Sequence, residues 1–165
     1  MTPFFRNDSI CLLNTKLQSK VGNNPPEGKT IMKRTIIRKH VFMILFRIEF
    51  HNLSELKEQE MLYLDRIEDI TDKDRDYVAQ RADKIIELLP EIDGKLDEIS
   101  KGWKLDRLGK VELAILRLAV FEMNFDEDIP TNVALNEAVE LAKTFGGDTS
   151  PSFINGVLGK LIEEN

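Results

Sequence analysis

Apolar residues recur at intervals of three and four along most of the chain, which is the spacing of one face of an α-helix. The first such helix is predicted from Lys33 to about Phe50, with Ile37, Val41 and Ile48 on its apolar face. Further helices are predicted over approximately residues 54–69, 71–89, 90–99, 110–125, 130–145 and from 150 onward. No segment has the alternating pattern of a strand. The sequence therefore predicts an all-α fold, a compact bundle of about six or seven helices.

Residues that favour the N-terminal end of a helix stand at several of these boundaries. Ser54 is a candidate N-cap for the second helix, and Thr71 or Asp72 begins the third. Ser150 followed by Pro151 has the pattern of an N-cap and a first-turn proline at the start of the last helix. We therefore expect helices to begin close to these residues.

Proline and glycine indicate where two helices end. Pro90 ends the third helix and can begin the next one. Gly146-Gly147 follows the stripe that ends at Phe145, and we expect it to stop that helix through a left-handed C-terminal position.

The segment from Lys110 to about Phe125 is apolar on almost every side. Such a helix is normally the central one of a bundle, covered by its neighbours. Arg117 and Glu122 interrupt it, and we expect them to form internal ion pairs or hydrogen bonds; contact with a partner is the alternative. Trp103, just before this helix, is expected to be a core residue.

Residues 1–31 have a different composition from the rest of the chain. They contain three of the six prolines, a polar run over residues 21–28 and no sustained helical stripe. We expect a disordered N-terminal extension, followed by one helical domain over residues 32–165. One hypothesis is that Met32 is the real translation start. An intact mass of the natively expressed protein that includes residues 1–31 would contradict it.

The charge is unevenly distributed. The formal net charge of -6 argues against binding of a polyanion when it is taken alone. From Lys29 to Arg47, however, there are six basic residues and no acidic one, whereas residues 49–100 contain sixteen acidic and seven basic residues. A compact basic site on an otherwise acidic protein is therefore consistent with the sequence.

Catalytic and metal-binding patterns are not found. The single cysteine, Cys11, excludes an internal disulfide and the usual cysteine-based zinc site. His40 and His51 are eleven residues apart, which matches no common metal motif. They are interpreted as ordinary residues, although His40 is close enough to the basic segment to assist a nucleic-acid contact. Residues 156–160 lack the spacing of a phosphate-binding loop. We expect no enzyme activity, no metal and no cofactor.

Membrane insertion and secretion are not expected either. The longest uninterrupted apolar run, Val41 to Phe46, is far shorter than the roughly 18–20 residues that a membrane span needs. The N-terminus has no sustained apolar stretch before a small-residue cleavage site. A chain with one cysteine suits a reducing compartment, so we expect a cytoplasmic protein.

The start of the first predicted helix is its most distinctive part. Arg34 and Arg38 are four residues apart and share a face, with Lys33 and Lys39 beside them. Cations at a helix N-terminus oppose the helix dipole, so local stability does not explain them. Two guanidinium groups on one face can bind phosphates or stack on unpaired bases. An amphipathic helix with a solvated basic side is an equally good interpretation of this feature alone.

Several ordered motifs in the rest of the chain resemble one known family. They are Trp103–Leu108, Val111–Ala119, Ile129-Pro130 with Val133–Lys143, and Phe153–Leu158, preceded by Arg34, Arg38 and Leu45-Phe46. Together these motifs resemble the transcription antitermination protein NusB family (N-utilisation substance B), over roughly residues 32–162.

The resemblance implies a helical, non-enzymatic protein that binds the boxA element of nascent RNA. It implies that binding occurs together with NusE, a small ribosomal protein. It also implies that the complex helps the RNA polymerase elongation complex read through termination signals, notably in ribosomal RNA operons. Some members self-associate, so we include a homodimer among the expected assemblies.

The resemblance also implies site residues. The predicted RNA-binding residues are Lys33, Arg34, Arg38 and Lys39 in the first helix, and Ser150, Phe153 and Asn155 in the last. Glu112 matches a position associated with the NusE side.

Some positions depart from the family pattern, and some have alternative interpretations. Thr149 and Ser152 stand where the family commonly has Asp and Lys, which removes one phosphate contact. Phe153 has an alternative role in the core, and Asn155 in local hydrogen bonding. A helical protein–protein adaptor without RNA specificity, with the basic helix docking an acidic partner, remains the alternative function.

Overall fold

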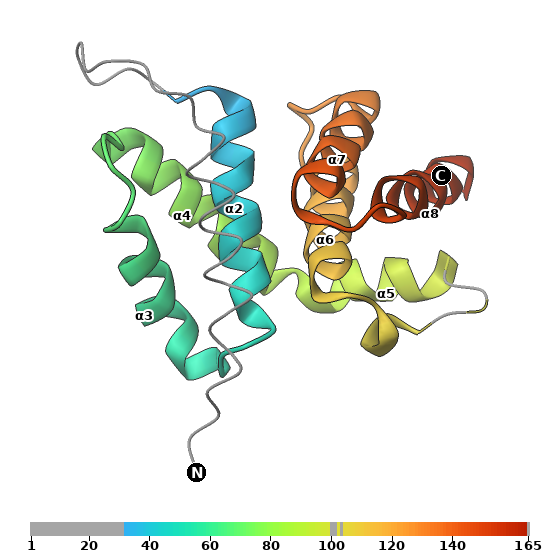
Figure 1. The fold of residues 1–165 in the computed structure, drawn as a ribbon, viewed down its shortest axis with the longest axis horizontal. Helices are drawn as coiled ribbons and strands as arrows, with labels where there is room; N and C mark the ends of the chain where they lie inside the picture. Colours follow the sequence, from blue (N-terminus) through green and yellow to red (C-terminus); the bar gives the residue numbers. More distant parts are fainter. Residues whose placement is uncertain (1–31, 100–101, 103, 165) are drawn as a thin grey trace. The chain divides into compact units, whose positions relative to one another are not determined.

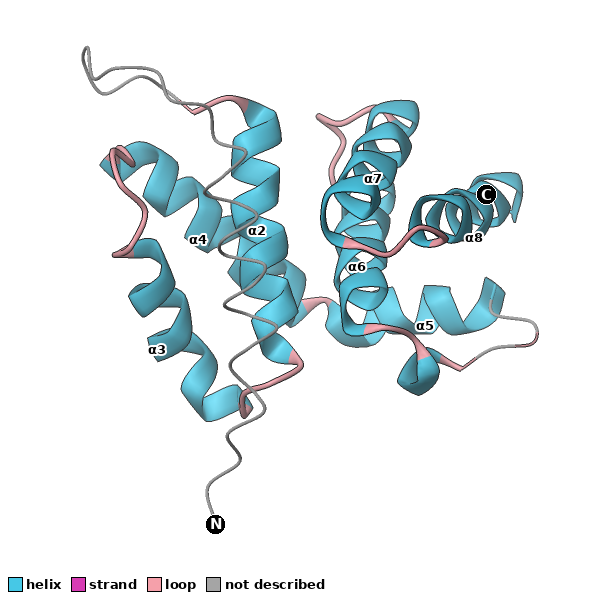
Figure 2. Ribbon diagram, in the orientation of Figure 1, coloured by secondary structure: helices cyan, strands magenta, loops and turns pink. Residues whose placement is uncertain are grey.

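The computed structural model describes residues 32–99, 102 and 104–164 (Figure 1). Within these residues the chain forms seven α-helices and one short 3-10 helix, joined by loops and turns (Figure 2). The predicted all-α class is therefore confirmed. The elements are α2 (Arg34–Ile48), α3 (Leu53–Leu64), α4 (Asp72–Glu87), α5 (Leu89–Ile99), η1 (Leu105–Arg107), α6 (Lys110–Asn124), α7 (Thr131–Phe145) and α8 (Ser150–Glu164).

The predictions for residues 1–31 and for Trp103 lie outside the described residues. The chain divides into two compact units, one that extends to Ala82 and one that begins at Asp83. They are described in turn, and the single helical domain over residues 32–165 stays a prediction.

In the first unit α2 packs against α3. The stripe predicted for α2 understates its burial, because the seven consecutive residues from Val41 to Arg47 are all buried. α4 begins where Thr71 was predicted to start it: the Thr71 hydroxyl oxygen accepts the Asp74 N–H at 3.0 Å and the hydroxyl donates to the Asp74 carboxylate at 2.8 Å. Met32 N–H donates to the same carboxylate at 3.0 Å, which ties the start of α2 to the start of α4.

In the second unit α6 packs against α5, α7 and α8, as expected of a central helix. Leu113–Leu116 and Leu118–Glu122 are buried. Arg117 lies between these two runs and donates to both carboxylate oxygens of Asp93 in α5, at 2.9 and 2.8 Å. The predicted internal ion pair of Arg117 is therefore confirmed.

Two predicted helix starts were wrong in detail. α3 begins at Leu53 after Asn52 rather than after Ser54, and the Asn52 N–H donates to the Glu55 carboxylate at 3.4 Å. Ser150 is the first residue of α8 rather than its N-cap. Its hydroxyl instead donates a hydrogen bond to Glu112 of α6.

The predicted left-handed position after α7 was also wrong. Gly146 has φ -85° and ψ -178°, an extended conformation that any residue can adopt. Glycine is needed there for space, since a Cβ would lie 2.5 Å from the Ser150 Cβ and 2.8 Å from the Ala142 carbonyl oxygen.

Candidate nucleic-acid interface

The four basic residues predicted in α2 differ in exposure. Lys33 and Arg34 are exposed, Lys39 is half-buried, and Arg38 is only 7% exposed. The shared face of Arg34 and Arg38 is therefore open mainly at Arg34. The structure brings the four residues together at one helix end, where Lys33 is the N-cap and no side chain caps the helix.

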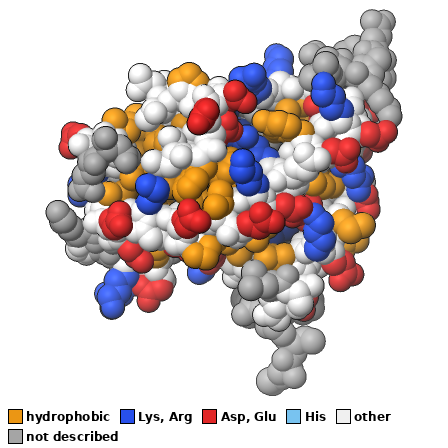
Figure 3. Space-filling view, turned by 180° about the vertical axis from the view of Figure 1, so that it is seen from behind, with side chains coloured by type: hydrophobic (Ala, Val, Ile, Leu, Met, Phe, Trp, Pro, Cys, Tyr) orange, Lys and Arg blue, Asp and Glu red, His pale blue; other side chains and the backbone are white. Residues whose placement is uncertain are grey.

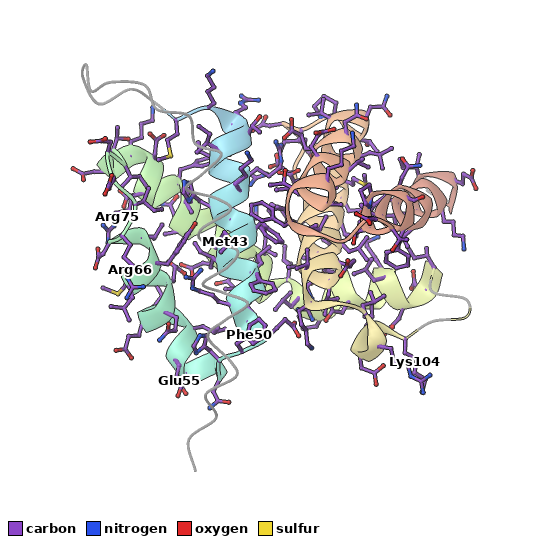
Figure 4. All side chains as sticks on the ribbon, viewed as in Figure 1. Met43, Phe50, Glu55, Arg66, Arg75 and Lys104 are labelled. Carbon is purple, nitrogen blue, oxygen red and sulfur yellow. The ribbon has the colours of Figure 1, made fainter. Side chains whose placement is uncertain are left out.

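A buried polar cluster lies on the same helix. His40 Nδ1 is 2.7 Å from the Tyr63 hydroxyl oxygen on α3. The Arg47 guanidinium lies 4.3 Å from the centre of the Tyr63 ring and donates to the Met43 carbonyl at 3.1 Å. Met43, whose carbonyl accepts this hydrogen bond, lies on α2 (Figure 4). The cluster joins α2 to α3 through polar contacts inside an apolar core.

Burial shifts the pKa of each titratable group in the cluster in the direction that disfavours its charged form. Burial, with the neighbouring charge of Lys39, lowers the pKa of His40 to about 4. Burial raises the pKa of Tyr63 and lowers the pKa of the Arg47 guanidinium. His40 is 4% exposed and neutral at neutral pH, so it adds no charge for a phosphate contact. This cluster was not predicted from the sequence; the only local signal is that His40 and Arg47 lie two helical turns apart.

The predicted residues of α8 divide into one buried residue and two accessible ones. Ser150 is 4% exposed, whereas Phe153 is half-buried and Asn155 is exposed. The Ser150 hydroxyl oxygen accepts the Gly147 N–H at 2.9 Å, and the hydroxyl donates to the Glu112 carboxylate. Ser150 and Glu112 were predicted for two different sites, RNA and partner, but they are hydrogen-bonded to each other.

Charges on the surface are otherwise mixed. On the face shown in Figure 3, basic and acidic side chains are interspersed with apolar ones. Arg75, in the first turn of α4, forms an ion pair with Asp65, which follows α3 (Arg75 is labelled in Figure 4). Among the described residues there is no group of three or more side chains suited to hold a metal ion. In the same part of the chain, every helix is too short or too polar to cross a membrane.

Comparisons with known proteins agree on one family. The model of the NusB family matches residues 35–163. The transcription antitermination protein NusB of Lachnoclostridium phytofermentans is 54% identical over 132 residues, which cover 80% of this chain and all of the relative. The protein of the same name from Agathobacter rectalis is 53% identical over 129 residues, 78% of this chain and 98% of the relative.

Solved structures show the same fold. T. maritima NusB superposes with a TM-score of 0.72 at 32% identity, covering 82% of this chain and 94% of that chain. A chain in a crystal structure of antitermination factors NusB and NusE with dsRNA gives a TM-score of 0.67 at 25% identity, covering 80% of this chain and 97% of that chain. The protein therefore belongs to the NusB family.

Proposed function

We propose that this protein is a transcription antitermination factor that binds boxA-type RNA of ribosomal RNA operon transcripts together with NusE, and acts on the RNA polymerase elongation complex in the cytoplasm. The observation that carries the proposal is the similarity, over nearly the whole described chain, to a protein solved with NusE and dsRNA. The proposed role needs neither catalysis nor a cofactor.

The start of α2 supplies the proposed phosphate contacts. Lys33 and Arg34 are exposed there, and Lys39 is half-buried beside them. Each such contact releases condensed counterions, so affinity falls as salt rises. Because the site is small, we expect modest affinity for RNA alone and higher affinity with NusE.

The first turns of α8 supply the proposed base contacts. The partly exposed ring of Phe153 offers a face for stacking, an interaction of roughly 1–3 kcal/mol. The exposed amide of Asn155 has both a donor and an acceptor for a base edge. Glu112 remains a proposed NusE-side residue, although its carboxylate accepts a hydrogen bond from Ser150.

Fluorescence anisotropy tests the proposal with a boxA-like RNA and a scrambled RNA, each with and without NusE, across a salt series. We expect the boxA-like RNA to bind more tightly and NusE to strengthen that preference. Equal binding of both RNAs in the presence of NusE would contradict the proposal.

A protein-binding adaptor is the second candidate function, and exposed apolar side chains in the first unit favour it. Met61 and Leu62 of α3 and Tyr77 of α4 are 54%, 45% and 48% exposed. Contiguous exposed apolar surface is typical of protein interfaces, including those of homodimers, whereas apolar side chains that are exposed singly are ordinary. Competition separates the two functions: boxA RNA should displace a protein ligand from α2 only if α2 is an RNA site. Sedimentation velocity reports the oligomeric state.

A further inference from the structure

One side-chain hydrogen bond joins residues 38 positions apart in the second unit. The Ser150 hydroxyl, at the start of α8, donates to Glu112 Oε1, in the first turn of α6. The same hydroxyl oxygen accepts the Gly147 N–H at 2.9 Å. The turn between α7 and α8 is therefore held to the start of the central helix through one buried serine.

Two glycines make room for this connection. A Cβ at Gly109 would lie 2.0 Å from Glu112 Oε2, and a Cβ at Gly146 would lie 2.6 Å from the Ser150 hydroxyl oxygen. Each residue of the Glu112–Ser150 pair thus lies against a glycine, Glu112 against Gly109 and Ser150 against Gly146. The packing is tight on the Ser150 side, where a Cβ at Gly146 would also lie 2.8 Å from the Ala142 carbonyl oxygen, whereas the Glu112 carboxylate at Gly109 is the end of a flexible side chain.

We infer that Glu112 and Ser150 are positioning residues, which fix the first turn of α8 and so orient Phe153 and Asn155 for RNA. This inference rests on the proposed function. The first turn includes the Phe153 N–H, which donates to the Thr149 carbonyl at 3.0 Å. Ser150 is buried, so it acts through the residues that follow it rather than by touching RNA.

The sign of the effect separates positioning from simple electrostatics. A carboxylate near RNA repels phosphates, so removing the charge of Glu112 should strengthen binding if charge alone mattered. If Glu112 positions α8, its removal weakens binding. The dependence of affinity on salt should then stay unchanged, because no phosphate contact is lost.

The experiment measures RNA affinity and salt slope for Glu112→Ala, Ser150→Ala, their combination and Glu112→Gln. We expect each alanine variant to bind boxA-like RNA about five- to tenfold more weakly, which corresponds to one hydrogen bond. The double variant should be little weaker than the worse single variant, because the two residues act as one unit. Glu112→Gln keeps an acceptor oxygen and should bind within about twofold of wild type.

Asp93→Ala is the matched control. It breaks the ion pair between Asp93 of α5 and Arg117 of α6, which lies in the same unit and involves neither Glu112 nor Ser150. It should leave RNA affinity unchanged at temperatures where the variant is folded. Wild-type affinity in both alanine variants, or an equal loss in Asp93→Ala, would overturn the inference.

Amide hydrogen exchange in the RNA-free protein separates this inference from the proposed function. We expect the Gly147 and Phe153 amides to exchange faster in Ser150→Ala but not in Asp93→Ala. Unchanged exchange in Ser150→Ala would overturn the positioning role, even if RNA binds. If wild type shows no preference for boxA while exchange changes as expected, only the proposed function fails.

Discussion

The basic residues at the start of α2 are chemically similar but differ in exposure, and exposure decides what each can do. Lys33 and Arg34 are accessible to an RNA backbone, whereas Arg38 is buried. Replacing Arg38 therefore changes packing as well as charge, and its effect on unfolding has to be measured beside its effect on RNA affinity.

Replacing both Lys33 and Arg34 with alanine should weaken RNA binding and flatten its salt dependence. For single-stranded RNA, the slope of log K against log salt should fall in magnitude by about 1.4, the value for two phosphate contacts. Anisotropy titrations over a salt series measure this slope. Lys104→Ala, which removes an exposed charge outside the predicted set, should leave it unchanged.

Two glycine-to-alanine changes should have opposite effects on stability. Gly146→Ala places a Cβ within 3 Å of Ser150 and of the Ala142 carbonyl, and it should lower the free energy of unfolding by about 1–3 kcal/mol. Gly156→Ala, on an open side of α8, meets nothing within 4 Å and should raise it by about 0.5–1 kcal/mol. Urea unfolding measures both. A stable Gly146→Ala variant would show that the turn can shift.

At the scale of helices, α2 and α3 are joined by a histidine that the fold keeps neutral. Because the pKa of His40 falls from 6.5 to about 4 on folding, the unfolded chain binds a proton that the folded chain does not in this range. The stability of the fold should therefore decrease as the pH falls from 6.5 towards 4, by on the order of 3 kcal/mol for this group.

The measurement is urea unfolding at several pH values for wild type and His40→Gln. Carboxylates titrate in both proteins, so the difference between the two curves isolates His40. We expect the stability of His40→Gln to fall less steeply between pH 6.5 and 4. Parallel curves would show that His40 is protonated in the folded protein at higher pH.

The Arg117–Asp93 ion pair joins α5 to α6 in a similar way. The side chain of Arg117 is 11% exposed, so Asp93→Ala leaves a largely buried charge without this partner. We expect the free energy of unfolding to fall by about 2 kcal/mol, less than for a fully buried pair because the Asp93 side chain is 29% exposed. Thermal unfolding measures the loss, and Lys143→Ala, at an exposed ion pair on α7, should change it by less than about 1 kcal/mol.

The helices could be predicted well from the sequence because the three- and four-residue spacing of apolar residues can be read within each segment, without knowledge of its neighbours in space. The apolar character of residues 110–125 identified α6 as a central helix without any tertiary information. Helix ends were less predictable. Ser54 is a residue type that favours the N-cap position, but it lies inside α3, which begins at Leu53 after Asn52. For Gly146 the sequence suggested a left-handed backbone conformation. In the structure a glycine is required there because Ser150 lies too close to leave room for a Cβ.

The residue types of the candidate site could be predicted from the sequence, but the hydrogen bonds between its residues could not. Basic residues at a helix start and the motifs of α8 are visible in the sequence. The Ser150–Glu112 hydrogen bond is not, because it joins positions 38 residues apart. Burial of Arg38 and His40 likewise depends on what packs against α2, which the pattern of one helix does not reveal.

At the scale of the whole molecule, the family match extends across both units, from residue 35 to residue 163. The proposed RNA contacts are likewise distributed, with the α2 residues in the first unit and the α8 residues in the second. Variants of each group therefore test separate parts of the proposal: phosphate contacts through salt dependence for α2, and base contacts through sequence preference for α8.

The burial of α6 also has a consequence for synthesis of the protein. A ribosome makes α6 before α7 and α8, two of the three helices that cover it. The 40 residues from Phe125 to Glu164 take about 2–8 s to translate at typical rates. During that interval the nascent chain presents an apolar helix with only part of its cover, so a chain that stalls after α7 should be held by chaperones or aggregate.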